Sequence, residues 1–183
     1  MSDPELPKRN LVTIFEVLDT NQDGNITRAD FETKAEQVTG LFELTGTETG
    51  DEIRASLVSW WEQLRNAYDQ DDDGVVTKDE FVQAHSPEDG DPEAFYREKV
   101  DQLVSVVARA VDENGDGYID EAEYVRLFSV SGLPGETVQA GFEALDTDKD
   151  GRVSVAEFET AIVQLFLSAN PADPGTALLG RQE

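Results

Sequence analysis

A 12-residue acidic pattern occurs four times in the chain: DTNQDGNITRAD (19–30), DQDDDGVVTKDE (69–80), DENGDGYIDEAE (112–123) and DTDKDGRVSVAE (146–157). Each copy has Asp first, Asp or Asn third, Asp fifth, Gly sixth, Ile or Val eighth and a carboxylate twelfth. At this chain's composition, about 0.03 accidental copies of the first six positions are expected. The pattern is therefore an internal repeat, and it is the feature from which the fold can be predicted.

The spacing of the repeat suits a bound calcium ion. Calcium prefers about six to eight oxygen ligands, and a 12-residue loop supplies them from positions one, three, five, seven, nine and twelve. The sixth residue has to turn sharply, which Gly does at least cost, and the seventh contributes only its backbone carbonyl. The predicted metal ligands are Asp19, Asn21, Asp23, Asn25, Thr27, Asp30, Asp69, Asp71, Asp73, Val75, Thr77, Glu80, Asp112, Asn114, Asp116, Tyr118, Asp120, Glu123, Asp146, Asp148, Asp150, Arg152, Ser154 and Glu157.

The composition of the 183 residues excludes other kinds of site. Cysteine is absent and His85 is the only histidine, so any metal must be held by oxygen, which favours hard cations. The formal net charge of −26 disfavours nucleic acids and anionic membranes as partners. No apolar run reaches the roughly 20 residues that span a bilayer, and the N-terminal residues lack the apolar stretch of a secretory signal. We therefore expect a soluble, cytoplasmic protein.

The first loop departs from the pattern at its twelfth position, where Asp30 replaces Glu. Its side chain is one methylene shorter, so bidentate coordination would pull the following helix inward. Fewer oxygens suit the smaller, octahedral magnesium ion relatively better. We predict up to four calcium ions, with magnesium possible in loop 19–30.

Helix capping is the alternative explanation for part of the pattern. The ninth residues stand three before an acid, where a capping box would satisfy free N–H groups at a helix start without any metal; they are Thr27, Thr77, Asp120 and Ser154. Capping explains neither the upstream acids nor the conserved spacing of the Gly within the repeat. Metal binding therefore remains the favoured interpretation of all four loops.

Helical periodicity flanks each loop, which predicts eight helices and almost no sheet. The position-eight residues should pair as short antiparallel strands between neighbouring loops, and Thr49–Glu52 resembles a capping box before the second loop's entering helix. Trp60 and Trp61 could form a ligand cage, but their spacing is more typical of a helix core. The breaker-rich stretch from His85 to Pro92 suggests a boundary. The predicted organisation is an N-terminal pair of loops (1–84), a linker (85–92), a C-terminal pair (93–169) and a tail (170–183).

With four such loops at uneven spacing and the tail sequence Leu178-Leu179-Gly180, the chain resembles the sarcoplasmic calcium-binding proteins and, among them, the calerythrin family. The resemblance implies an all-α fold in which four EF-hands form two pairs packed into one compact domain. It also implies a cytosolic calcium buffer or carrier. Relatives of this type carry Asp at the twelfth position of the first loop, as Asp30 is here. They commonly lack ligands in the second hand, whereas loop 69–80 retains its full set.

Three functions compete on the sequence. A buffer needs only occupied loops and a closed interior, and it requires no protein partner; we expect such a protein to be a monomer. A calcium sensor exposes an adaptable groove, usually rich in methionine, whereas Met1 is the only methionine here. The third possibility is a carrier of a small apolar ligand, similar to the photoproteins, whose cavities contain several His, Trp and Tyr residues. No arrangement of catalytic side chains stands out, so an enzyme is not expected.

Overall fold

A computed structural model describes residues 5–84, 104–108 and 110–178. The predicted linker 85–92 lies outside the described residues, as does the first part of the helix expected before the third loop. The expectation of a mostly helical protein with little sheet is confirmed, and the described residues show an entering or exiting helix beside each loop. Residues 104–108 and 110–111 are helical and lead into the third loop.

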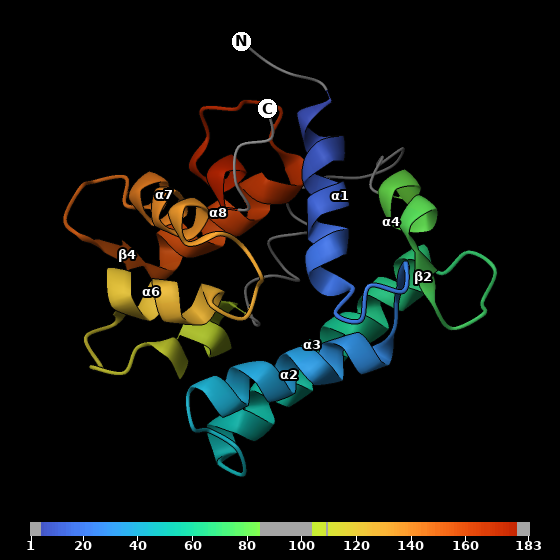
Figure 1. Cartoon of the computed structure of the whole chain (residues 1–183), viewed down its shortest axis with the longest axis horizontal. Helices are drawn as coiled ribbons and strands as arrows, with labels where there is room; N and C mark the ends of the chain where they lie inside the picture. The colour runs from blue at the N-terminus through green and yellow to red at the C-terminus, as the bar shows by residue number, and fades with distance from the viewer. Residues whose placement is uncertain (1–4, 85–103, 109, 179–183) are drawn as a thin grey trace.

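The first two loops form one half of the molecule, with entering and exiting helices on either side of each loop (Figure 1). The helices and strands of this half are α1 (Leu6–Leu18), β1 (Asn25–Ile26), α2 (Arg28–Leu41), α3 (Glu48–Tyr68), β2 (Val76–Thr77) and α4 (Lys78–Ala84). The second half contains β3 (Tyr118–Asp120), α6 (Glu121–Phe128), α7 (Gly135–Leu145), β4 (Arg152–Ser154), α8 (Val155–Leu167) and the short 3₁₀ helix η1 (Pro174–Ala177).

The loops pair through two-stranded antiparallel sheets, as the apolar residues at position eight predict. Ile26 lies opposite Val76 in one sheet, and Ile119 lies opposite Val153 in the other. All four side chains are at most 1% exposed. Each sheet therefore ties two loops together from within the core, and loop one is joined to loop two and loop three to loop four.

The start of α3 differs from the predicted capping box at Thr49–Glu52. The N-cap residue is Thr47, whose hydroxyl accepts a hydrogen bond from Gly50 N–H at 3.1 Å and donates one to the Leu44 carbonyl at 2.8 Å. The preceding turn places Gly46 at a positive φ of 78°, which brings Thr47 rather than Thr49 over the free N–H groups. The prediction was wrong by two residues because both positions offer a threonine and the turn selects between them.

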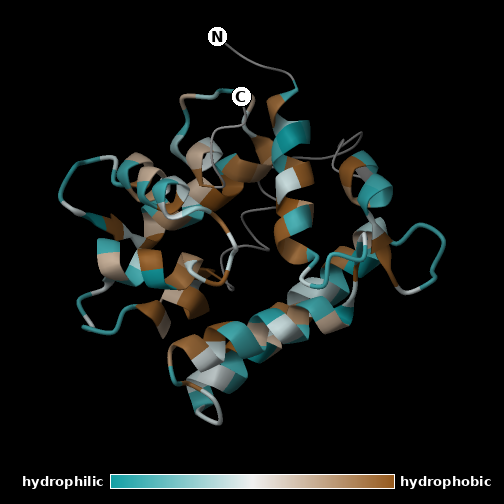
Figure 2. Cartoon of the chain, viewed as in Figure 1, coloured by the Kyte–Doolittle hydropathy of each residue, from teal (hydrophilic) through white to brown (hydrophobic). Residues whose placement is uncertain are grey.

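A single cluster of buried apolar side chains runs through both halves, and hydrophobic and hydrophilic residues alternate along the helices of both halves (Figure 2). Trp61 is 3% exposed and lies near the Phe31 ring, with 5.9 Å between ring centroids. Trp60 meets the same ring edge-on at 5.3 Å. Trp61 therefore belongs to the core, and Trp60 is partly buried against it, as the spacing on the helix predicts.

Two polar contacts join the halves directly. The buried Asn10 side chain of α1 donates a hydrogen bond to the Leu165 carbonyl of α8 at 3.1 Å. Arg126 of α6 donates to the Leu41 carbonyl at the end of α2 at 2.6 Å and lies over the Phe42 ring at 4.9 Å. These contacts fix α1 against α8 and α6 against the end of α2.

The C-terminal segment packs back onto the protein. The 3₁₀ helix η1 contacts both α7 and α8, and Leu178 is 1% exposed within the common core. A Cβ atom on Gly175 would lie 2.1 Å from the Ala161 carbonyl oxygen, so only glycine permits this approach to α8. The predicted docking of the tail is confirmed for Leu178, while Leu179 lies outside the described residues.

Candidate metal centres

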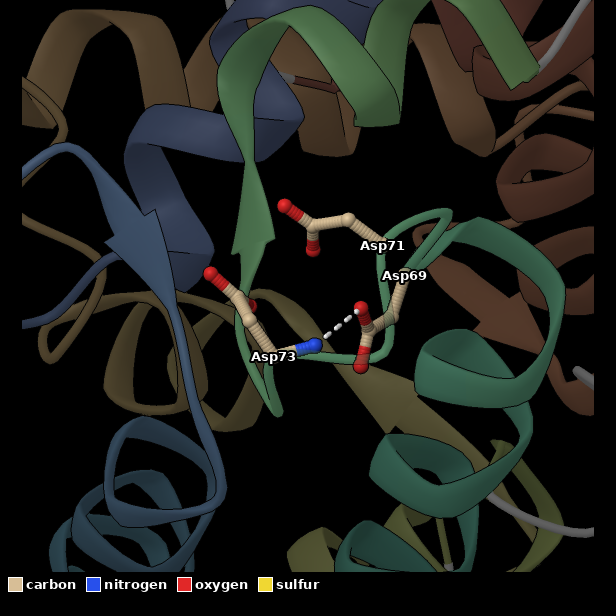
Figure 3. A group of neighbouring side chains, drawn as sticks. All are labelled: Asp69, Asp71 and Asp73. Carbon is tan, nitrogen blue, oxygen red and sulfur yellow. Dashed lines mark hydrogen bonds between the residues drawn. The ribbon is translucent and has the colours of Figure 1, made fainter.

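The first Asp of each loop organises the turn that follows it. In the second loop Asp69 Oδ1 accepts a hydrogen bond from Asp73 N–H at 3.1 Å, and Oδ2 accepts one from Gly74 N–H at 3.0 Å. Figure 3 shows the Asp69, Asp71 and Asp73 side chains gathered around the inside of this loop. In the fourth loop Asp146 accepts the equivalent two bonds, both at 3.0 Å. The carboxylate of the first Asp therefore stabilises the turn of its own loop by accepting backbone hydrogen bonds.

The upstream acids converge in two of the four loops. Carboxylate oxygens of all three residues lie within 4.8 Å of one another in the groups Asp69, Asp71, Asp73 and Asp146, Asp148, Asp150. In loops one and three the third residue of the loop is an asparagine, Asn21 or Asn114. These two loops therefore have one carboxylate fewer among their first five residues. Oxygen donors at this separation suit a hard divalent cation, which would neutralise repulsion among the acids.

The residue at position four has an unusual backbone conformation in every loop. Its φ is positive at Gln22 (58°), Asp72 (57°), Gly115 (73°) and Lys149 (62°), in addition to the Gly at position six. A side chain in this region costs about 1–2 kcal/mol. Only the third loop avoids that cost, because it has Gly at position four as well. The sequence shows that only the third loop has Gly at position four, but the repeat pattern does not reveal that this position requires a positive φ.

The twelfth residue joins the two ends of each loop. Its carboxylate accepts N–H bonds from the second and the ninth residue, with distances of 3.0 and 2.9 Å for Asp30, 3.1 and 2.9 Å for Glu80, 2.9 and 3.0 Å for Glu123, and 3.1 and 2.9 Å for Glu157. This geometry keeps the carboxylate at the loop closure, where the repeat predicts the last ligand.

Hydroxyl groups add further bonds to three of these carboxylates. Asp30 accepts the hydroxyls of Thr20 and Thr27, both at 2.7 Å, and is 1% exposed. Burial opposes its ionisation, but the bonds from Thr27 and Thr20 outweigh it and lower the pKa of this carboxyl. Bonds from Thr77 and Gln70 lower the pKa of Glu80. The carboxylates of Asp30 and Glu80 are therefore held in the charged form that a cation requires.

The ninth residues take part in helix capping. Asp120 Oδ1 accepts a hydrogen bond from Glu123 N–H at 2.9 Å, and the Ser154 hydroxyl accepts one from Glu157 N–H at 3.2 Å. Capping boxes are present at Thr27, Asp120 and Ser154. Capping and a position in the predicted ligand set thus coexist at the same residue. A ninth side chain engaged in this way would act on an ion through water.

Arg152 has a role that the repeat did not predict. Position seven was expected to supply only a carbonyl, but the Arg152 guanidinium donates to Asp150 Oδ2 at 3.1 Å and lies 3.9 Å from Asp116 Oδ2. It also lies over the Tyr118 ring at 4.0 Å. A positive charge therefore stands between predicted ligands of loops three and four. The signal in the sequence was a basic residue at position seven of the fourth loop, which lies opposite Asp120 in the β3–β4 pair.

The fold, the paired loops and their convergent oxygens together define a calcium-binding protein built from EF-hand pairs. The family described as "EF-hand domain pair" matches residues 8–86 and 109–163, and this chain belongs to it.

Several characterised proteins are similar to the chain over most of its length. Calexcitin-1 of Caenorhabditis elegans is 26% identical over 184 residues, which cover 97% of this chain and 87% of calexcitin-1. Calerythrin of Saccharopolyspora erythraea is 24% identical over 152 residues, covering 81% and 85% of the two chains. The expected relationship to the calerythrin family is confirmed.

Solved structures show the same fold. A calcium-binding protein of Streptomyces coelicolor, described in terms of prokaryotic calcium-mediated regulation, matches with a TM-score of 0.77 and 26% identity over 87% of this chain and 97% of that one. The sarcoplasmic calcium-binding protein of amphioxus matches with a TM-score of 0.78 and 20% identity over 99% and 100%. In the part of the chain that the structure describes, helices fall short of the length and apolarity needed to cross a bilayer.

Proposed function

We propose that this calcium-binding protein is a cytosolic calcium buffer or carrier that works as a monomer. The observation that carries the proposal is the docked tail. Leu178 is buried between the halves, in the region that a sensor would offer to a target helix. A protein whose own tail occupies this region needs no partner for it.

The exposed surface supports the same function. Among the described residues, Val125 is the only large apolar side chain that is strongly exposed, at 42%. A sensor groove would require a contiguous apolar patch and adaptable methionines. The EF-hand family is typically non-enzymatic, which agrees with a protein whose role is binding.

The loops define what such a buffer would hold. We propose up to four calcium ions at the 24 predicted ligand positions, with magnesium competing most strongly at loop 19–30. No step beyond binding and release is needed from the chain's own residues. Sedimentation of the calcium-loaded protein tests the monomer, and fractionation of cells that produce it tests the cytosolic location.

Dye binding to apolar surface tests buffer against sensor. The full chain and a truncation that ends at Ala169 are compared with calcium and with chelator. A buffer binds less dye when calcium is present, and the truncation binds more dye than the full chain because the Leu178 site is uncovered. A rise in dye binding by the full chain on adding calcium would contradict the proposal.

The second candidate is a calcium sensor. It is favoured by the Streptomyces coelicolor structure, which is described in terms of calcium-mediated regulation and covers most of this chain. The same dye experiment separates the two functions, since a sensor gains apolar surface with calcium and a buffer loses it.

A further inference from the structure

Arg126 of α6 connects loop three with the far end of the helix that leaves loop one. One guanidinium nitrogen, Nη1, donates to the Glu113 carboxylate, and the other, Nη2, donates to the Leu41 carbonyl at 2.6 Å. The guanidinium also lies over the Phe42 ring, 4.9 Å from its centroid. Because a guanidinium carries several N–H groups in a fixed fork, one side chain can hold both acceptors at once.

The Glu113 end of this contact belongs to loop three. Glu113 is the second residue of the loop, and its backbone N–H donates to Glu123 Oε1 at 2.9 Å. Glu123 is the predicted twelfth ligand, and Arg126 follows it by three residues, so the two residues are neighbours on the surface of α6. An ion that binds Glu123 therefore fixes the first turn of α6, from which Arg126 extends.

The Leu41 end of the contact belongs to α2, the helix that leaves loop one. The last carbonyls of an α-helix have no partner within the helix, and a positive charge beside them suits the helix dipole. Helix α2 has no basic residue in its own last turn, so Arg126 provides this charge from the other half. The opposite end of α2 contains Asp30, whose carboxylate closes loop one.

Helix α2 can transmit a restraint from one end to the other because it is packed along its length. Phe31 is 1% exposed, Ala35 is fully buried, and Phe42 at the C-cap is 7% exposed. All three belong to the common core. A helix packed in this way is displaced as a unit, since a close-packed interior transmits strain. The Arg126 contact therefore also restrains Asp30.

We propose that Arg126 is a positioning residue that couples ion binding at loop three to ion binding at loop one. An ion in loop three holds α6, and with it Arg126, against α2, and the restrained α2 keeps Asp30 at the closure of loop one. Less ordering then remains for the ion that binds loop one, so its affinity rises. By linkage, an ion in loop one raises the affinity of loop three by the same factor. The inference rests on the proposed calcium binding at these two loops.

Two glycine amides report the two loops separately. Gly24 N–H donates to Asp19 Oδ2 and Gly117 N–H donates to Asp112 Oδ2, both at 2.8 Å, so the NMR signal of each amide responds to an ion in its own loop. Calcium is titrated into the full chain, first with loop three intact and then with loop three disabled by Glu123→Gln. The Gly117 signal verifies that loop three stays empty in this variant.

Disabling loop three should weaken calcium binding at loop one by about fivefold. This factor is near the lower end of the usual coupling between sites, because the Arg126 side chain is 37% exposed and water screens its charge. The affinity of loop one should be lower with loop three disabled at every salt concentration at which both variants are folded.

Matched variants separate the coupling from a general effect of charge. Arg126→Lys keeps the positive charge but replaces the fork with one ammonium group, so disabling loop three should then change loop one by less than about twofold. Glu113→Ala removes the loop-three end of the contact and should have the same effect. Arg65→Lys is the control, because Arg65 pairs with Glu62 of its own helix, and it should retain the full coupling. Thermal unfolding in calcium verifies that each variant is folded.

Two results would overturn the coupling while leaving the proposed function intact. One is a loop-one affinity that does not fall when loop three is disabled. The other is a fall of the same size in Arg126→Lys and in the wild-type chain, which would assign the coupling to the common core or to the Asn10–Leu165 contact. A Gly24 signal that never responds to calcium would instead remove loop one from the proposed ion sites, and the coupling with it.

Discussion

At the scale of single residues, the four loops share the same set of loop-closing hydrogen bonds and differ in a few side chains that contact the predicted metal ligands. The twelfth carboxylate closes each loop through backbone N–H groups, whether it is Asp or Glu. Asp30 achieves this from a shorter side chain and accepts two threonine hydroxyls as well. A carboxylate has about four lone-pair positions, so all of those of Asp30 have protein donors. An ion at loop one must compete with these bonds.

Asp30→Glu should therefore strengthen calcium binding at loop one relative to magnesium, by about tenfold, because the longer side chain can approach an ion with both oxygens. Calorimetric calcium titrations with and without millimolar magnesium measure the change. Glu80→Asp is the matched control and should have the opposite effect at loop two. Equal changes in calcium and magnesium affinity in Asp30→Glu would show that side-chain length does not set the preference.

Arg152 adjusts the second pair of loops through charge. Its guanidinium is close to Asp150 and Asp116, so it competes with a cation for the same oxygens. Arg152→Gln should raise calcium affinity in loops three and four by about two- to fivefold at low salt, and the gain should shrink as salt screens the charges. Arg28→Gln is the control, because Arg28 pairs with Glu32 and Glu62, outside the predicted ligands. A similar gain from both variants would indicate a general charge effect.

At the scale of helices, glycine allows two elements to pack closely where a Cβ atom would collide with the neighbouring element. Gly141 of α7 is such a position: a Cβ atom there would lie 2.8 Å from the hydroxyl oxygen of Tyr124 on α6. Tyr124 is fully buried, and its hydroxyl has no hydrogen-bond partner among the described residues. Helices α6 and α7 are therefore in close contact at this point, where the Tyr124 hydroxyl of α6 packs against Gly141 of α7 without forming a hydrogen bond.

Gly141→Ala should lower the free energy of unfolding of the calcium-loaded protein by about 1–3 kcal/mol, because overpacking outweighs the better helix propensity of alanine. Tyr124→Phe alone should be neutral or stabilising, since it removes an unpaired buried hydroxyl. In the double variant the phenyl ring leaves room for the methyl group, and stability should recover. Denaturant unfolding of the four proteins completes the cycle, and additive effects of the two substitutions would refute the contact.

At the scale of the whole molecule, charge opposes the fold and bound ions relieve it. The predicted ligand side chains include 15 of the chain's 40 acids, and four calcium ions would change the formal net charge from −26 to −18. Three acids converge within 4.8 Å in each of loops two and four. The contacts between halves, such as Asn10 with Leu165, hold together two strongly acidic units.

Removing calcium should therefore lower the melting temperature sharply. An ion that binds only the folded state stabilises it by about 2.7 kcal/mol per site at a hundredfold excess over its dissociation constant. Thermal unfolding in chelator, with and without added salt, measures the effect. Salt should restore part of the lost stability by screening the acids. An unchanged melting curve in chelator would mean that the packed core alone sustains the fold.

The sequence by itself determined the repeat, the loop pairing and the chemistry of the candidate sites. These features are local. Each loop is formed by 12 consecutive residues, and an apolar residue at the eighth position of each loop, such as Ile26 or Val76, can pair with its equivalent in the neighbouring loop. Capping at Ser154 was predictable for the same reason, because the residues that interact are three apart. The start of α3 was missed even at this range, since the turn at Gly46 chose between two threonines.

Only the tertiary structure decided which distant residues meet. Arg126 reaches the end of α2 across 85 residues of chain, Gly175 lies against Ala161, and Lys34 enters the wall of a cavity shared by both halves. No local pattern encodes these contacts, because packing depends on the shapes of surfaces that come together only when the helices are assembled. The loops could therefore be predicted from short-range chemistry, whereas the docked tail's surroundings and the cavity follow from how the two halves fit.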